Sequence, residues 1–194
     1  MNRLLYIVLL LLSPVLMAAD IEEPRWELID KMDQVELRRY APSIQAVTEL
    51  GSSAGTSSGF RLLAGYIFGG NERAQSIAMT APVQETLEKT RPVMAFTLPA
   101  EYSMEELPTP NDERVSLVEV PQRTVAAVRF SGWATGGKVA RMQRKLLATL
   151  ATHGIESVGV PVLNQYNPPW TAPFLRRNEV SVEVVLGGDL AATR

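Results

Sequence analysis

Apolar and polar residues alternate over several short stretches of the chain, which is the pattern of strands that bury one face. In residues 35–39, Val35 and Leu37 alternate with Glu36 and Arg38, so this stretch predicts a strand with one solvated face. Similar extended runs occupy residues 43–50, 76–79, 83–87, 93–98, 115–120, 124–130 and 179–185. Prolines and short polar loops separate many of them, which predicts a sheet of many short strands.

Two other segments repeat apolar residues at helical spacing. Between Val139 and Leu150, apolar residues recur at offsets of three, four and four, which predicts a helix over 137–153 that ends at Gly154. An earlier helix is predicted where Phe60, Leu63 and Ile67 recur before two further glycines.

Residues 51–59, which precede the earlier helix, are almost all Gly, Ser, Ala and Thr and predict a flexible loop. A strand, a loop of small residues and a glycine-terminated helix therefore occur twice, over 43–70 and 124–154. We accordingly expect an α+β fold in which two pseudo-symmetric repeats form a largely antiparallel sheet or open barrel, with two helices packed on it. A cleft between helix and sheet would be its natural pocket.

The N-terminus has the parts of a secretory signal. Arg3 precedes residues 4–17, which are apolar except for a serine and a proline, and small residues follow. An uncleaved anchor is the alternative, although a spanning helix needs roughly 20 apolar residues. We predict a signal peptide at 1–19, one domain at 20–186 and a flexible tail at 187–194. The mature protein would be periplasmic or secreted, without stable insertion into a membrane.

Composition narrows the chemistry. The chain of 194 residues has a net charge of −2, so it lacks the basic surface that nucleic-acid binding requires. It contains no cysteine, which excludes disulfides, thiol nucleophiles and cysteine-based zinc sites. The domain must therefore be stable through burial alone.

His153 is the only histidine, and it falls near the apolar stripe of the later helix. It is a candidate axial ligand to haem iron or a lone acid–base group. The alternative is a residue that interacts with the dipole at the end of its helix. No strained nucleophile motif accompanies it, so we expect a binding protein and not an enzyme.

Three motifs in order resemble the SOUL family of haem-binding proteins. They are VELRRY at 35–40, FRLLAGYIFGGN at 60–71 with AMTAPV at 78–83, and QYNPPW at 165–170 with RRNEV at 176–180. The resemblance extends from about Glu23 to Val185, nearly the whole predicted domain.

The resemblance implies a twisted, mostly antiparallel β-barrel built from the two repeats and flanked by two α-helices. It also implies a haem or other porphyrin held non-covalently in an apolar cleft against the earlier helix. Its apolar contacts would be Phe60, Leu63 and Ile67. Arg61 would bind a propionate. Apart from the resemblance, Trp170 follows two prolines that predict a rigid turn, and it is a further candidate to cap the cleft. Some relatives have a lysine where this chain has Thr171, so the resemblance does not carry over that propionate contact. The alternatives are that the aromatic and aliphatic residues form core and that Arg61 is an ordinary surface residue.

Two other functions remain open at this point. The first is a small-molecule effector-binding domain of the gyrase-inhibitor-like type, to which the chain is more loosely similar. An inward-pointing Glu179 would favour it, and a Glu179 paired with an arginine would not. The second is a partner-binding module whose cleft is filled by its own side chains.

Overall fold

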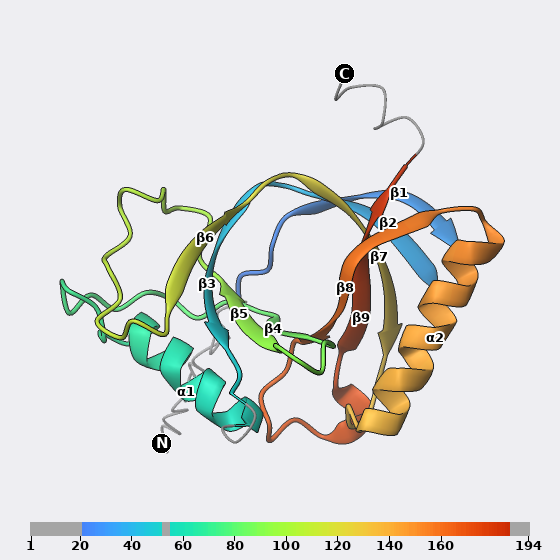
Figure 1. Ribbon diagram of the computed structural model, residues 1–194. Coiled ribbons are helices and arrows are strands. Elements are labelled where there is room, and N and C mark those ends of the chain that lie inside the picture. Colours follow the sequence, from blue (N-terminus) through green and yellow to red (C-terminus); the bar gives the residue numbers. More distant parts are fainter. Residues whose placement is uncertain (1–20, 52–54, 187–194) are drawn as a thin grey trace, which may run out of the picture.

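The computed structural model describes residues 21–51 and 55–186, so the predicted signal peptide and the predicted tail lie outside the described residues. Nine strands and two α-helices make up this part of the chain (Figure 1). In chain order they are β1 (Trp26–Met32), β2 (Val35–Tyr40), β3 (Ser43–Glu49), α1 (Gly55–Ile67), β4 (Val83–Thr86), β5 (Val93–Thr97), β6 (Ser116–Val120), β7 (Arg123–Phe130), α2 (Gly136–Thr152), β8 (Glu156–Gln165) and β9 (Asn178–Val185). A single 3₁₀ turn, η1 (Pro173–Leu175), lies between β8 and β9.

The strands form one sheet in the order β1-β2-β7-β9-β8-β4-β5-β3-β6, and all neighbours are antiparallel. The order strand–strand–helix–strand–strand occurs twice, as β2–β3–α1–β4–β5 and as β6–β7–α2–β8–β9. The first strand of each unit pairs with the second strand of the other, β2 with β7 and β6 with β3. Pairing of β4 with β8 joins the two units.

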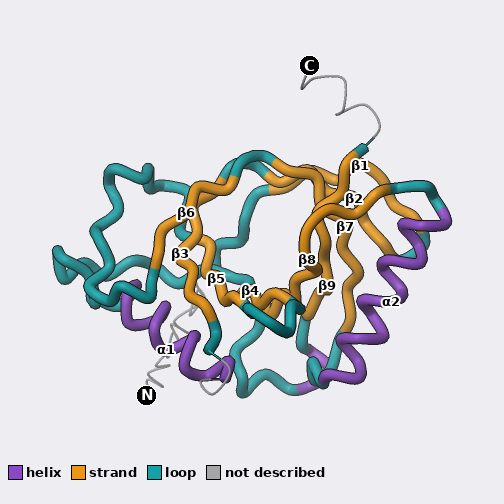
Figure 2. The backbone as a smooth tube through the Cα atoms, viewed as in Figure 1, coloured by secondary structure: helices purple, strands orange, loops and turns teal. Residues whose placement is uncertain are grey.

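The α+β class and the antiparallel pairing are confirmed, but the prediction of a barrel is wrong. A barrel closes only when its first and last strands exchange hydrogen bonds. Among the described residues, β1 pairs only with β2 and β6 only with β3, so both remain edges of an open sheet. The sheet is strongly curved, and the helices lie on the outside of the curve (Figure 2).

Both helices cover the same face of the sheet, here called the helical face. Each lies over its own apolar core. The core beneath α2 is made by Met32, Val35, Leu37, Ala126, Val128, Phe130, Val139, Leu146, Leu150, Leu163, Val180, Val182 and Val184. The core beneath α1 is made by Ala46, Leu50, Leu63, Tyr66, Ile67, Ile77, Met94, Phe96, Leu98, Leu107 and Val115. No helix among the described residues is long and apolar enough to cross a bilayer.

The helix α1 begins earlier than predicted, at Gly55, inside the segment expected to be a loop. Gly59 explains how a glycine-rich start is tolerated, because a Cβ at this position would overlap Leu50 Cδ2. The small residues therefore let α1 approach β3 and β5 closely. Burial of Leu63 and Ile67 outweighs the weak helix propensity of the first turns.

Strands β1 and β8 were not predicted, and the strand predicted over residues 76–79 is absent. Within residues 76–79 only Ser76 makes an isolated bridge, to Phe68, and the following Thr80 makes another to Glu22. By contrast, β8 lies between β9 and β4, although Gly159 has a φ of 74° and the register shifts between Val158 and Val162. The prediction of a solvated face on residues 35–39 also fails for Arg38, which is 4% exposed.

Candidate ligand-binding groove

A groove of about 480 Å³ lies on the helical face where the two repeats meet. The first turns of α1 form one wall, strands β4 and β5 form the floor, and the segment that joins β8 to β9 forms the other wall. The lining residues are Thr56, Ser57, Phe60, Arg61, Val83, Met94, Gln165, Asn167, Pro169 and Arg176. We call it the α1 groove.

The apolar part of the α1 groove centres on Phe60. Its ring contacts Phe96 edge to face at a centroid distance of 5.3 Å, yet the residue remains 40% exposed. Val83 and Pro169 supply further apolar surface. The neighbouring Thr56 and Ser57 are small, so the ring stays open toward the groove. This arrangement suits a flat apolar ligand.

Two arginines at the α1 groove differ in how they are held. Arg176 is 8% exposed, and its guanidinium donates hydrogen bonds to the carbonyl oxygens of Thr171, at 2.9 Å, and of Pro169. It also stacks on Trp133 at 3.9 Å. Arg61 is exposed and has no hydrogen-bond or ion-pair partner in residues 21–51 and 55–186. Its guanidinium is therefore available for a carboxylate.

The wall opposite α1 is fixed by a buried charge network around Glu179, which is 2% exposed. Arg38 donates to both carboxylate oxygens of Glu179, at 2.7 and 3.2 Å, and Tyr166 donates to one at 3.0 Å. Although burial opposes it, hydrogen bonding to Glu179 keeps the pKa of Arg38 above its usual range. Burial raises the pKa of Tyr166, and the negative charge of Glu179 adds to the effect.

An outer ion pair ties the same wall to the N-terminal segment. The Arg177 guanidinium donates to both carboxylate oxygens of Glu23, at 3.0 and 2.5 Å, and its backbone N–H donates to the side chain of Asn167. Asn167 lines the α1 groove. The groove wall is thus positioned by contacts that are distant in sequence.

The five predicted contact residues fall into three groups by their position relative to the α1 groove. Phe60 and Arg61 line the α1 groove. Leu63 and Ile67 are 0% and 1% exposed and pack in the core beneath α1. Trp170 is 83% exposed and lies next to Pro169 in sequence, outside the lining of the groove.

His153 lies at the C-terminal end of α2, over the other half of the sheet from α1 (Figure 1). It is exposed, and its Nδ1 is 2.9 Å from the carbonyl oxygen of Thr149. In the described ranges no three His, Asp or Glu side chains converge as a metal site. His153 is therefore remote from the α1 groove.

Sequence reasoning missed the floor and the far wall of the groove. Val83, Gln165 and Arg176 line it, and each belongs to one of the motifs quoted above. The motifs were thus a usable signal. Only the pairing of β4 with β8, which sets Val83 opposite Gln165, shows that two of them meet.

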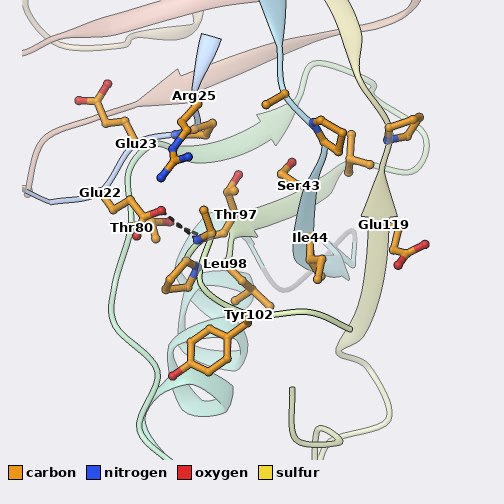
Figure 3. A pocket seen from close by; sticks show the side chains of 17 residues that line it. Glu22, Glu23, Arg25, Ser43, Ile44, Thr80, Thr97, Leu98, Tyr102 and Glu119 are labelled. Carbon is orange, nitrogen blue, oxygen red and sulfur yellow. Dashed lines mark hydrogen bonds between the residues drawn. The ribbon is translucent and has the colours of Figure 1, made fainter. Parts of the chain in front are cut away.

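A second hollow, of about 620 Å³, lies near the start of β3 (Figure 3). Ile44, Leu98 and Tyr102 give it an apolar side. Its charged residues are Glu22, Glu23, Arg25 and Glu119, three carboxylates against one cation. The dashed line in Figure 3 is the hydrogen bond from the backbone N–H of Ala100 to Glu22. An excess of carboxylates disfavours an anionic ligand here.

Comparison with known proteins gives one family. The model of the family described as SOUL heme-binding protein matches residues 21–183. Heme-binding protein 2 of Mus musculus is 26% identical over 191 residues, which cover 84% of this chain and 90% of that protein.

Solved structures share the fold at low identity. The C-terminal domain of EcmrR aligns with a TM-score of 0.60 at 13% identity, over 78% of this chain and 97% of that one. A hydrolase from Listeria innocua aligns with a TM-score of 0.60 at 10% identity, over 81% of this chain and 94% of that one. Likeness at these identities shows the fold alone.

Proposed function

Because this chain belongs to the SOUL heme-binding protein family, we propose that it binds haem or another tetrapyrrole non-covalently in the α1 groove. The observation that carries the site assignment is the pair formed by Phe60 and Arg61. A partly exposed aromatic ring and an arginine without a partner among the described residues line one groove. A macrocycle with carboxylate side chains matches both features.

The residue types at the groove support a particular mode of binding. The chain has no cysteine for a thioether bond, and its single histidine is at the end of α2. Affinity would therefore come from the macrocycle and its carboxylates more than from iron ligation. We expect the metal-free porphyrin to bind within a few-fold of haemin.

The same structure disfavours the two other functions. Glu179 is paired with Arg38, which by the criterion stated above argues against an effector site built on that carboxylate. The α1 groove is not filled by the protein's own side chains, which argues against an occluded cleft. We propose a binding role without catalysis.

We also propose that the protein is exported, on the basis of residues 1–19 alone. N-terminal sequencing of the protein purified from the periplasm or the medium tests this directly. A start near residue 20 is expected. An intact first methionine on protein recovered from the cytoplasm would contradict export without affecting the binding proposal.

The binding proposal is tested by titrating the full-length protein with haemin and with protoporphyrin, monitored by tryptophan fluorescence and absorption. Replacing Arg61 with Gln removes a charge-assisted hydrogen bond, worth about 1.5–3 kcal/mol, and should weaken both ligands by roughly tenfold or more. Phe60→Ala should weaken both by a similar factor. Arg144→Gln, an exposed arginine on α2, is the matched control and should change nothing.

Each result is decisive. Absence of saturable binding by the unaltered protein would overturn the proposed function. Binding that neither Arg61→Gln nor Phe60→Ala weakens would retain the function and remove the site from the α1 groove. Haemin binding that far exceeds porphyrin binding would contradict the proposed mode.

A further inference from the structure

A third cavity, distinct from the α1 groove and from the hollow of Figure 3, lies on the inner side of the curved sheet, opposite the helices. We call this side the concave face. The cavity has a volume of about 330 Å³, smaller than the α1 groove. It adjoins the hollow of Figure 3, with which it shares Pro24, Ser43, Thr97, Val120 and Pro121.

The floor of this cavity is a row of hydrogen-bonded side chains. Gln45 on β3 donates to Gln84 on β4 at 2.8 Å, and Gln84 donates to Asn164 on β8 at 2.9 Å. Asn164 in turn donates to Ser181 on β9 at 2.8 Å. The row crosses both repeats, so it holds the cavity floor in one arrangement.

Beside this ordered floor lies one buried hydroxyl group, that of Thr97. Thr97 is 6% exposed, and its Oγ1 has no hydrogen-bond partner among the described residues. Burial of an unpaired polar atom is unfavourable. Thr97 lines the cavity, where a polar ligand atom would satisfy it.

An arginine also lies in the wall of the cavity. Arg123 on β7 is half-buried and has no hydrogen bond or ion pair within residues 21–51 and 55–186. Its nearest aromatic contact is the Tyr40 ring, 6.0 Å from the guanidinium carbon. Burial lowers the pKa of Arg123, and the charge of Glu183 partly offsets this effect. Arginine nevertheless stays protonated, so the site favours a carboxylate.

The rest of the wall is apolar. The valines that line the cavity are Val47, Val93, Val120, Val125, Val158, Val160 and Val162; Val182 borders it as well, but belongs to the core beneath α2. Arg123 and Glu183 are the two charged lining residues. They are diagonal neighbours on β7 and β9, because Val125 pairs with Glu183.

We propose that the cavity on the concave face binds a small carboxylate with an apolar body. Arg123 holds the carboxylate, Thr97 supplies a hydrogen bond, and the valines contact the body. An amino group on the same ligand would face Glu183. This site is separate from the α1 groove and does not depend on tetrapyrrole binding.

The test is an NMR titration of the ¹⁵N-labelled full-length protein with 4-methylpentanoate and with leucine. These ligands share an apolar body and a carboxylate, and only leucine has an amino group. The side-chain amide signals of Gln45, Gln84 and Asn164 should shift and saturate, also in the presence of excess haemin. Arg123→Gln should weaken binding by tenfold or more. Arg129→Gln on the same strand, exposed and outside the cavity lining, should leave it unchanged.

Further ligands and a further variant in the same titration define which groups of the ligand are recognised. Tighter binding of leucine, lost in Glu183→Gln, would assign Glu183 to the amino group and support the proposal. Equal binding of both ligands would support recognition of the carboxylate alone. Isopentylamine binding as well as the acid would overturn the proposal. So would the absence of saturable shifts, or equal effects of the two arginine substitutions in variants whose spectra show the native fold.

Discussion

On the helical face of the sheet, Leu63 of α1 and Leu146 of α2 pack against the strands, and the cores beneath both helices are apolar. On the concave face, Arg38 and Glu179 are buried almost as completely, at 4% and 2% exposed, but they contact each other, Tyr166 and, for Arg38, the Trp26 ring at 4.3 Å. Consecutive residues of the same strands supply both faces, since side chains alternate along a strand.

The difference teaches where stability and binding come from in this fold. Apolar burial is non-directional, so the helical face loses stability in proportion to the surface removed. A buried polar network stabilises only when every member has a partner. Removing one member of the network on the concave face therefore leaves a charge unpaired. By contrast, the Thr97 hydroxyl and the Arg123 guanidinium have no hydrogen-bond partner within residues 21–51 and 55–186, and these are the groups that the proposed ligand would contact.

The largest expected effect comes from breaking the network on the concave face. Glu179→Ala removes both oxygens that Arg38 contacts and leaves a buried guanidinium without its main partner. We expect the free energy of unfolding to fall by about 3–5 kcal/mol, measured by urea denaturation.

The double variant Arg38→Met with Glu179→Leu is the control for that prediction. It removes both charges and should be more stable than Glu179→Ala. A double variant that is less stable would show that the network contributes more than the avoidance of an unpaired charge.

The next largest effect is expected from two buried leucines, Leu63 on α1 and Leu146 on α2. Leu63→Ala and Leu146→Ala should each lower the free energy of unfolding by about 2–5 kcal/mol, because both residues are 0% exposed. Neither should change the haemin affinity of the folded protein by more than about twofold. Weaker haemin binding by Leu63→Ala alone would show that Leu63 contacts the ligand, as the family resemblance implies.

One buried tyrosine on each face should make the stability of the protein depend on pH in the alkaline range. Burial raises the pKa of Tyr66 to about 12, and burial with the charge of Glu179 raises the pKa of Tyr166. Both neutral phenols stabilise the fold fully below about pH 10, and that stability is lost as the pH rises through the folded pKa values. Tyr66→Phe and Tyr166→Phe should each flatten this loss in urea denaturation between pH 9 and 11, measured relative to the unaltered protein. A parallel decline in all three proteins would contradict the assignment.

The smallest effect comes from two glycines of α1. A Cβ at Gly65 would meet nothing within 4 Å, so Gly65→Ala should stabilise the protein by about 1 kcal/mol. Gly59→Ala must displace Leu50 and should stabilise less or destabilise. Thermal denaturation ranks the two, and the opposite order would contradict the close approach of α1 to β3.

The amino-acid sequence predicted both helices and most of the strands, because the apolar residues that face the helical cores recur at regular spacing. The later helix was predicted over 137–153 and is observed over 136–152. Strand β8 was not predicted, since Gly159 and Pro161 interrupt its alternation, although pairing on both sides keeps it in the sheet. Local pattern is a weak guide where long-range pairing decides.

The two candidate sites also differ in how far the sequence could predict them. Phe60 and Arg61 were predicted from a local motif and do line the α1 groove. The cavity on the concave face could not be predicted, because Arg123 and Gln45 are ordinary polar residues of alternating strands. Only the curvature of the sheet turns a face that alternation marks as solvated into an enclosed one.

The reciprocal pairing of β2 with β7 and of β6 with β3 has a consequence for folding. Each repeat lends its first strand to the sheet of the other, so neither can complete its hydrogen bonds alone. Contacts between residues some 90 apart, such as Val35 with Val128, must form before either sheet is whole, which favours slow, all-or-none folding. By the same logic, an isolated single repeat would satisfy its edges only by exchanging strands with a second copy of itself.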